Sequence, residues 1–208
     1  MNKLFSLSKV GRGVSEHAPS SASGSFISKY LVAHYQKIQN LDKDLKRVPE
    51  KEEFMFLQSD KQFNAFTFIP LICSKMSLKH LFVATYSINQ KVIAALVELH
   101  KEGLIEQITI IVSDTLLSRN QAISDQLAAI DSQYANISVL FAWVHAKVCL
   151  LQAEDDHYVI EGSGNWSDNA AYEQYIFANS KGLYDFRMKL FTETTIRHKV
   201  IFGNITKL

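Results

Sequence analysis

Residues 144–151 read VHAKVCLL, and residues 162–165, which begin seventeen positions after the histidine, read GSGN. In an extended strand successive side chains alternate between two faces, so His145 and Lys147 are predicted to project from the same side. A second β-like run, residues 157–160 (HYVI), ends at the GSGN turn, and a hairpin between the two runs is predicted to bring that turn close to the histidine. The segment combines a nucleophile, a fixed cation and an anion-binding turn, the parts that phosphodiester chemistry needs.

Upstream of this segment, strand-like and helix-like runs alternate. β-Branched and apolar runs predict strands at 81–86, 108–112 and 137–143. Apolar residues spaced three and four apart predict helices at 90–101 and 120–130. This order predicts an α/β fold, a sandwich with a mixed, mostly parallel sheet flanked by helices and one antiparallel hairpin.

Three segments are predicted along the chain. Residues 1–25 are rich in glycine and serine, which is typical of a flexible N-terminal arm. Residues 26–53 are predicted to form an N-terminal helical segment, with an amphipathic helix that ends before Pro49. The apolar residues of that helix recur at spacings of three or four, at Ile27, Leu31, Tyr35, Ile38, Leu41 and Leu45. Residues 54–208 form the predicted catalytic domain, in which no repeat and no second domain is evident.

Composition indicates a globular chain, because 47% of the residues are hydrophobic and 21% are charged, enough to build and solvate a core. The net charge of +1 gives no overall basic field that would indicate nucleic acid. Cys73 and Cys149 are too few for a disulfide framework and have no histidine at metal-ligand spacing. Uncharged stretches such as residues 62–74 are shorter than a membrane span, and the N-terminus lacks a signal-peptide core, so the expected location is cytoplasmic.

The motif segment resembles the HKD motif of the phospholipase D superfamily, written H-x-K-x4-D-x6-G-S-x-N. The residues that match this pattern are His145, Lys147, Gly162, Ser163 and Asn165. Glu173, eight residues past Asn165, falls where many members carry a glutamate. The resemblance implies the α/β sandwich of the superfamily, in agreement with the order of elements above.

The sequence departs from the pattern in two ways. Gln152 stands where the pattern has aspartate, and the spacing from histidine to glycine is three residues longer. Asp155 lies seven residues before Gly162, so an insertion of three residues in the hairpin explains both departures. The aspartate in this family resembles a structural element more than a reacting one.

The chain contains one copy of the motif. None of the other histidines is followed two positions later by lysine: His17, His34, His80, His100, His157 and His198. Two-motif members of the superfamily build one active site from two such histidines. The resemblance therefore implies a homodimer like the small single-motif nucleases, in which a two-fold axis brings two copies of His145 together.

The resemblance implies a phosphodiesterase that needs no metal and no cofactor and that forms a phosphohistidine at His145. It gives catalytic roles to Lys147 and Asn165, which hold the nonbridging oxygens, and to Glu173, which fixes the tautomer of the imidazole. It gives substrate-binding roles to the turn residues Gly162, Ser163 and Gly164. It implies no residue as a metal ligand.

Nucleic acid is the favoured substrate and partner, because single-motif dimeric members resemble endonucleases and a symmetric groove suits a polyanionic strand. A lipid phosphodiesterase is the alternative enzyme, although no basic amphipathic helix indicates a membrane partner. A non-catalytic module that binds nucleic acid or phosphate is the alternative from another class.

Several motif residues also have plain structural interpretations. The turn at 162–164 can be an ordinary loop, since glycine and serine are common turn formers. Trp166 is expected in the core, and Cys149 is expected as a buried thiol. Asp168 and Asn169 are expected to cap a helix that carries Tyr172 and Glu173.

Overall fold

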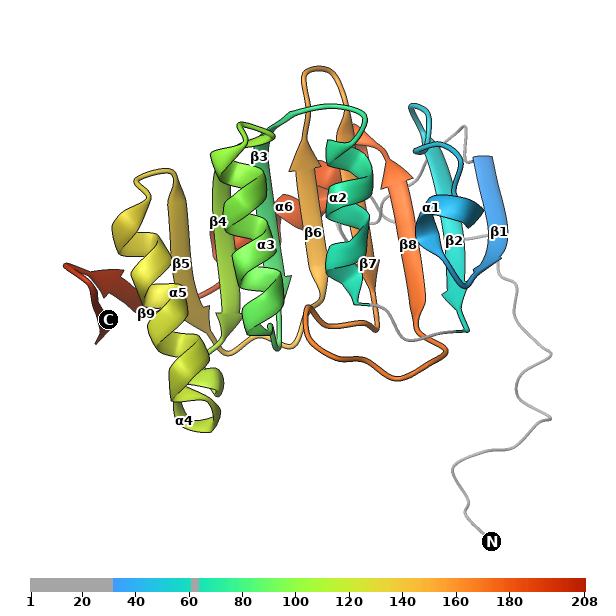
Figure 1. The fold of residues 1–208 in the computed structure, drawn as a ribbon. Coiled ribbons are helices and arrows are strands. Elements are labelled where there is room, and N and C mark those ends of the chain that lie inside the picture. Colours follow the sequence, from blue (N-terminus) through green and yellow to red (C-terminus); the bar gives the residue numbers. More distant parts are fainter. Residues whose placement is uncertain (1–31, 61–63) are drawn as a thin grey trace, which may run out of the picture.

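The computed structural model of the chain describes residues 32–60 and 64–208 (Figure 1). The expected arm at 1–25 lies outside the described residues, as do residues 26–31. The strands are β1 (Val32–Ile38), β2 (Glu53–Ser59), β3 (Leu78–Thr85), β4 (Ile105–Ser113), β5 (Ile137–Ala142), β6 (Val148–Gln152), β7 (His157–Gly162), β8 (Gln174–Asn179), β9 (Ile196–Ile201) and β10 (Asn204–Lys207). The described strands form a ten-stranded sheet in the order β1-β2-β8-β7-β6-β3-β4-β5-β9-β10.

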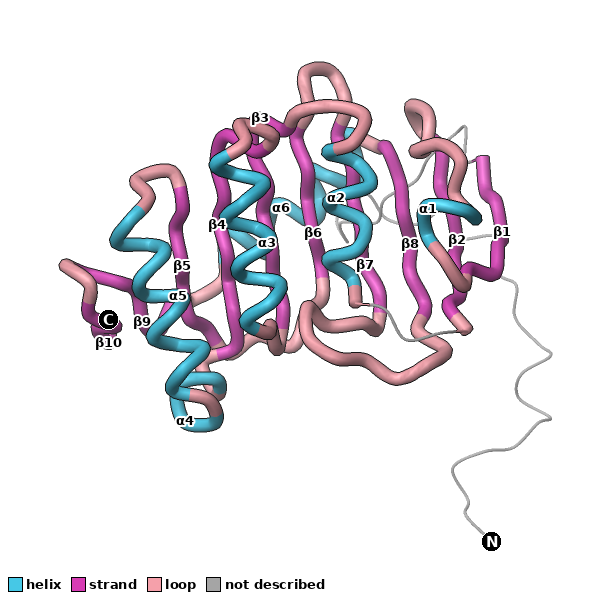
Figure 2. The backbone as a smooth tube through the Cα atoms, in the orientation of Figure 1, coloured by secondary structure: helices cyan, strands magenta, loops and turns pink. Residues whose placement is uncertain are grey.

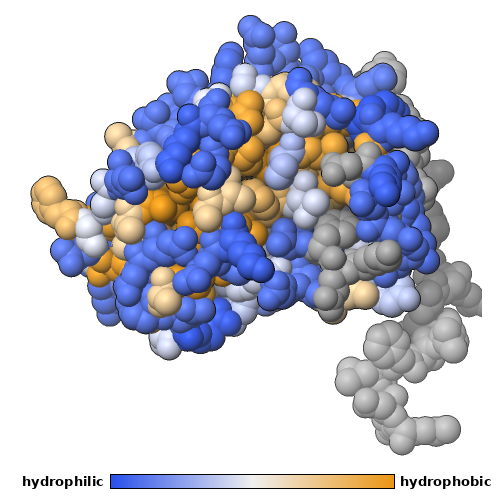
Figure 3. All heavy atoms as spheres, in the orientation of Figure 1, coloured by the Kyte–Doolittle hydropathy of each residue, from blue (hydrophilic) through white to orange (hydrophobic). Residues whose placement is uncertain are grey.

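Helices cover both faces of this sheet. They are α1 (Leu41–Asp44), α2 (Phe68–Cys73), α3 (Gln90–Lys101), α4 (Leu116–Arg119), α5 (Gln121–Gln133) and α6 (Lys181–Glu193), with a short 3-10 turn η2 (Ala65–Thr67) before α2. In Figure 1, α2, α3 and α5 lie in front of the sheet and α6 lies behind it. Figure 3 shows hydrophobic side chains in the middle of the front face between mostly hydrophilic edges. The predicted α/β sandwich is therefore confirmed.

The prediction that the sheet is mostly parallel was wrong. Among the described strands the pairs β1–β2, β3–β4 and β4–β5 are parallel. The other six pairings are antiparallel. A parallel pair needs a long crossover, usually a helix, and β6, β7 and β8 follow one another without one. The sheet is thus mixed, with its parallel part limited mainly to β3, β4 and β5.

The predicted helical segment at 26–53 is also wrong within the described residues. Residues Val32–Ile38 form strand β1, and only the four residues of α1 are helical. The backbone of β1 pairs in parallel with the whole of β2, from Val32 opposite Glu53 to Ile38 opposite Ser59. Apolar spacing alone does not separate a helix from an edge strand, and this continuous ladder of hydrogen bonds decided the outcome.

The elements before the motif follow the sequence more closely. The helix predicted at 90–101 is α3, in which the Asn89 side chain caps the start by accepting from the Val92 amide at 2.9 Å. The other predicted helix and the three strands appear as α5, β3, β4 and β5, with ends shifted by a few residues. These elements place the carboxyl ends of β3, β4 and β5 at one edge of the sheet.

Candidate active site

The motif residues gather at that edge. Figure 2 shows the loops after β3, β5 and β7 along the lower side of the sheet. His145 and Lys147 lie in the loop before β6, not in a strand as predicted, because the ladder of β6 with β3 starts only at Val148. The Gly162 amide donates to the Lys147 carbonyl oxygen at 3.2 Å. The hairpin of β6 and β7 thus brings the two halves of the motif together, as the sequence predicted.

His145 and Lys147 contact each other directly. The Lys147 Nζ lies 3.2 Å from Nδ1 of His145 and donates to the His145 carbonyl oxygen at 2.9 Å. His145 is exposed and Lys147 is half-buried. Burial lowers the pKa of Lys147, and the nearby negative charge of Glu173 partly offsets this by raising it. The pair therefore holds a cation of lowered pKa beside an accessible imidazole.

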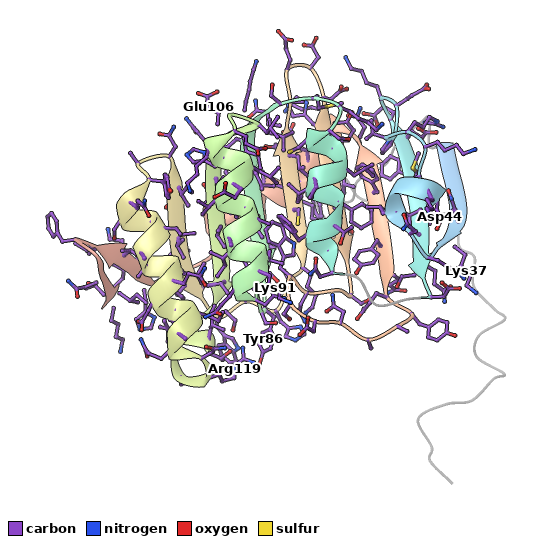
Figure 4. The ribbon with its side chains drawn as sticks, viewed as in Figure 1. Lys37, Asp44, Tyr86, Lys91, Glu106 and Arg119 are labelled. Atoms are coloured by element: carbon purple, nitrogen blue, oxygen red, sulfur yellow. The ribbon has the colours of Figure 1, made fainter. Side chains whose placement is uncertain are left out.

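One side chain outside the motif, Tyr86, packs against this histidine, and a second, Arg119, packs against Tyr86. The Tyr86 ring centroid lies 4.6 Å from that of His145, and the guanidinium carbon of Arg119 lies 4.4 Å from the Tyr86 centroid. Figure 4 shows Tyr86 and Arg119 next to each other at the lower edge. The Tyr86 ring is tilted by 48° against the His145 ring, and Arg119 lies over Tyr86, so one cation and two rings are in contact in a row.

The glycines of the turn are required by packing against β8. A Cβ on Gly162 would lie 2.0 Å from the Gln174 carbonyl oxygen, and a Cβ on Gly164 would lie 2.1 Å from the buried Tyr175 hydroxyl. Any larger residue would push the turn away from β8. The two glycines therefore fix the position of the turn that the sequence assigned to substrate binding.

Ser163 and Glu173 are joined side chain to side chain. The Ser163 hydroxyl donates to the Glu173 carboxylate and accepts from the Gln174 amide at 3.1 Å. The Glu173 amide in turn donates to the Ser59 hydroxyl at 2.9 Å. The Glu173 carboxylate thus accepts from Ser163, and it acts on Lys147 through its negative charge.

Asn165 and Asn169 form a reciprocal pair. The Asn165 amide donates to Asn169 Oδ1 at 2.9 Å, and Asn169 Nδ2 donates to the Asn165 carbonyl oxygen at 2.9 Å. Within the described residues the side-chain oxygen of Asn165 is buried without a hydrogen-bond partner. Residues 168–173 form no helix, and Tyr172 has a φ of 65°, so the predicted capped helix is wrong. The Asn169 side chain organises a loop instead.

The motif loop is tied to the loop after β3. The Trp166 amide donates to the Ser87 carbonyl oxygen at 3.1 Å, and the Asn89 amide donates to the Trp166 carbonyl oxygen at 3.2 Å. Trp166 is 1% exposed, as expected for a core residue. Cys149 is buried too, and burial raises its pKa to about 12, so its thiol is not a nucleophile.

A cavity of about 820 Å³ opens beside His145 and Lys147. It runs along the face of the sheet that α6 covers, where Phe56, Ile176 and Leu190 supply apolar walls. An ion pair between Arg187 and Glu161 also lines it. The cavity therefore offers an apolar space next to the histidine.

The two departures from the motif lie at the opposite end of the hairpin. Gln152 is the last residue of β6, and residues 153–156 form the turn. Asp155 is exposed in this turn, whereas Asp156 accepts from the Asn179 side chain at 2.8 Å. The acid with a structural contact is therefore Asp156, one position after Asp155, the residue that the motif spacing predicted.

No group of three histidine, cysteine, aspartate or glutamate side chains is arranged to hold a metal ion within 32–60 and 64–208. In the same part of the chain no helix is both long and apolar enough to cross a lipid bilayer.

Sequence reasoning missed Tyr86, Arg119 and Ser59. Tyr86 follows β3 and Arg119 ends α4, both far from the motif in the chain. Tyr86 contacts His145, and Arg119 contacts Tyr86, so both contacts are tertiary. The usable signal was position: polar and aromatic residues just past the carboxyl ends of neighbouring parallel strands often form ligand sites.

The sequence matches a known protein family over the residues that form this site. Residues 72–186, more than half of the chain, match the family described as the cardiolipin synthase, PLD-like domain. The chain belongs to the phospholipase D superfamily. The matched residues of this PLD-like chain run from α2 into α6 and include the whole motif.

Solved structures with a related arrangement include three from bacteria. NucT from Helicobacter pylori is 18% identical, with a TM-score of 0.45 over 68% of this chain and 94% of NucT. Polyphosphate kinase from Porphyromonas gingivalis is 12% identical, with a TM-score of 0.48 over 64% of this chain and 26% of the kinase. Phosphatidylserine synthase from Haemophilus influenzae is 11% identical, with a TM-score of 0.45 over 69% of this chain and 39% of the synthase. No curated protein matches the PLD-like chain.

Proposed function

We propose that the PLD-like chain is a metal-independent phosphodiesterase, an endonuclease that hydrolyses nucleic acid through a phosphohistidine. The observation that carries this proposal is the contact between the Lys147 ammonium group and Nδ1 of His145 beside the turn at 162–165. An imidazole next to such a cation can attack phosphorus while the cation neutralises a nonbridging oxygen.

The reaction takes two steps and two histidines. Nε2 of His145 attacks phosphorus, the N–P bond forms, and the P–O bond to the leaving group breaks as the partner's His145 protonates the leaving oxygen. Water then attacks phosphorus, the partner's His145 accepts its proton, and the N–P bond breaks. Both histidines return to their starting forms. Because one chain supplies one such histidine, the active unit is a homodimer, with a dimer mass in light scattering as its check.

Lys147 also controls which histidine nitrogen carries the proton. An ammonium group that donates to Nδ1 leaves the neutral ring protonated at Nε2, without a lone pair there for attack. When Lys147 transfers its hydrogen bond to a nonbridging oxygen, Nδ1 is free to take the proton and Nε2 becomes the nucleophile. A phosphate between two histidines further favours one imidazolium, while mutual repulsion disfavours two.

The turn and Asn165 complete the site. The Asn165 side chain has no hydrogen-bond partner for its amide oxygen among the described residues, so its amide group is available for reorientation toward a phosphate. Glycine at 162 and 164 allows the backbone to approach an anion closely. Glu173 holds the Ser163 hydroxyl and supports the charge of Lys147.

A lipid phosphodiester is the second candidate substrate. The apolar walls at Phe56, Ile176 and Leu190 give the cavity room for an acyl chain next to His145. Nucleic acid is favoured over lipid because Arg119, an exposed cation, stacks on Tyr86 beside the same histidine.

The test is cleavage in excess chelator. The full chain is incubated with single-stranded DNA, duplex DNA, RNA and phosphatidylglycerol vesicles, each with EDTA, and covalent phosphoprotein is trapped at alkaline pH. We expect cleavage of nucleic acid that survives EDTA and a phosphohistidine at His145. Activity that disappears with EDTA and returns with magnesium contradicts the mechanism. Headgroup release without nucleic-acid cleavage favours the lipid substrate, and binding without turnover favours a non-catalytic module.

A further inference from the structure

Trp143 is a large aromatic side chain exposed two residues before His145. It is 75% exposed, whereas Trp166, the second tryptophan of the sequence, is 1% exposed. Two residues of extended chain span about 7 Å at most, so the Cα atoms of Trp143 and His145 lie within that distance of each other. An exposed indole at this place offers a flat, amphipathic surface on which another ring can stack.

The indole is held in place by charged neighbours. The guanidinium carbon of Arg197 lies 5.0 Å from the Trp143 ring centroid, and Asp114 holds Arg197 through an ion pair of 2.9 Å. Trp143, Arg197, Asp114 and Thr115 line a shallow hollow of about 370 Å³. A ring fixed in this way loses little side-chain entropy when a flat ligand stacks on it.

Tyr86 contacts His145, and Arg119 contacts the Tyr86 ring. Arg119 is exposed, and it forms no ion pair with a carboxylate in the part of the chain that the structure describes. Its guanidinium group is therefore available for a phosphate oxygen. Two aromatic rings and the guanidinium group of Arg119 thus lie on the part of the chain that surrounds His145.

This combination fits an unpaired nucleic-acid strand. Proteins bind single strands through aromatic rings that stack on bases and cations that follow the backbone, and a base inside a duplex has no free face for such stacking. Resting on the proposed function, we propose that Trp143 stacks on the base next to the scissile phosphate and that Arg119 binds a neighbouring phosphate. The preferred substrate is single-stranded nucleic acid.

The test uses the indole as its own reporter. The full chain carrying His145→Ala, which prevents cleavage, is titrated with a single-stranded oligonucleotide while tryptophan fluorescence is recorded. We expect quenching with normal bases, and little quenching with an oligonucleotide of equal length that is abasic around its centre. Trp143→Ala is expected to raise the dissociation constant roughly tenfold for the normal oligonucleotide, the size of one lost stack. For the abasic oligonucleotide the same substitution adds no further loss.

Phe202→Ala is the matched control, because Phe202 is 99% exposed on the turn between β9 and β10, and it is expected to leave the affinity unchanged. Equal quenching by normal and abasic strands, or no quenching at all, would overturn the proposal. So would a blue shift that grows with protein concentration in the absence of nucleic acid, because it assigns Trp143 to a contact between copies.

The two proposals fail separately. If the oligonucleotide quenches the fluorescence but the unsubstituted chain does not cleave it, the proposed enzymatic function is contradicted and the proposed stacking of Trp143 is supported. If the chain cleaves nucleic acid in EDTA but the quenching does not depend on the bases, the proposed stacking is contradicted and the proposed enzymatic function is supported.

Discussion

The two ends of the β6–β7 hairpin differ in how much freedom their residues have. At the lower end the Gly162 amide bonds to the Lys147 carbonyl oxygen, and Gly164 packs directly against Tyr175. At the upper end residues 153–156 form a turn in which the side chains of Glu154 and Asp155 are exposed. Both departures from the HKD pattern lie at the upper end. The difference teaches that backbone packing fixes the positions of the motif residues at the lower end, and that three extra residues at the upper end leave those positions unchanged.

The largest expected effect comes from His145→Ala. Loss of the nucleophile, and of the acid in the partner, should reduce turnover by on the order of 10⁴-fold or more and abolish the phosphoprotein, with the fold retained because the side chain is exposed. Rates and thermal unfolding of the purified variant measure this. Gln152→Ala, at the other end of the hairpin, is the control and should be nearly silent. Unchanged activity of the His145 variant would exclude the phosphohistidine mechanism.

The second prediction concerns Lys147 and pH. Lys147→Ala should cost about 3 kcal/mol of transition-state stabilisation, by analogy with the loss of an oxyanion donor. In the unsubstituted chain activity should fall as pH rises through the pKa of Lys147, which burial lowers below the usual lysine value. Glu173→Gln removes a charge that raises this pKa, so its alkaline limb should move to lower pH.

The pH profile of kcat/KM measures that shift. Glu154→Gln, an exposed carboxylate in the hairpin turn, is the matched control and should keep the original limb. If the alkaline limb of the Glu173→Gln profile moves to higher pH, the conclusion that Glu173 raises the pKa of Lys147 is contradicted.

The third prediction tests packing at the lower end. Gly164→Ala places a methyl group 2.1 Å from the Tyr175 hydroxyl, so the turn or the buried tyrosine must shift. We expect a loss of about 1–3 kcal/mol in unfolding free energy, together with reduced activity. Denaturant unfolding measures the first effect. A variant as stable and active as the parent would show that the turn is not held by this contact.

The smallest expected effects are in the hairpin turn. Asp156→Ala removes one of the hydrogen-bond partners of the Asn179 side chain and should cost about 1 kcal/mol of stability, without a change in chemistry. Asp155→Ala should stay within about 0.5 kcal/mol of the parent, since its side chain is exposed. A larger loss of stability for Asp155→Ala than for Asp156→Ala would indicate that Asp155 is the counterpart of the motif aspartate.

The sequence predicted those helices and turns whose structure is determined by residues close together in the chain. The helix at α3 has both an apolar repeat and an Asn89 cap, and both are visible in the sequence. The meeting of Lys147 and Gly162 also follows from the hairpin alone. Segment 32–38 was not predictable in the same way, because its strand depends on pairing with β2.

The parts of the site that escaped prediction depend on contacts between distant residues. Asn169 is a reasonable helix cap in sequence, yet its side chain bonds to Asn165 and closes a loop. Tyr86 reaches His145 and Arg119 only after β3, β4 and the motif loop have come together. The roles of His145, Lys147, Asn165 and Glu173 in catalysis stay predictions.

The hydrogen bonds between Trp166 and the loop at 87–89 have a consequence for folding kinetics. They join residues almost eighty positions apart, so they form only after a long chain segment has closed, an entropic cost that local helices and hairpins do not carry. The β6–β7 hairpin can form early on its own, but the loop after Gly162 acquires its final position late. Refolding chains should therefore regain secondary structure first and enzymatic competence last.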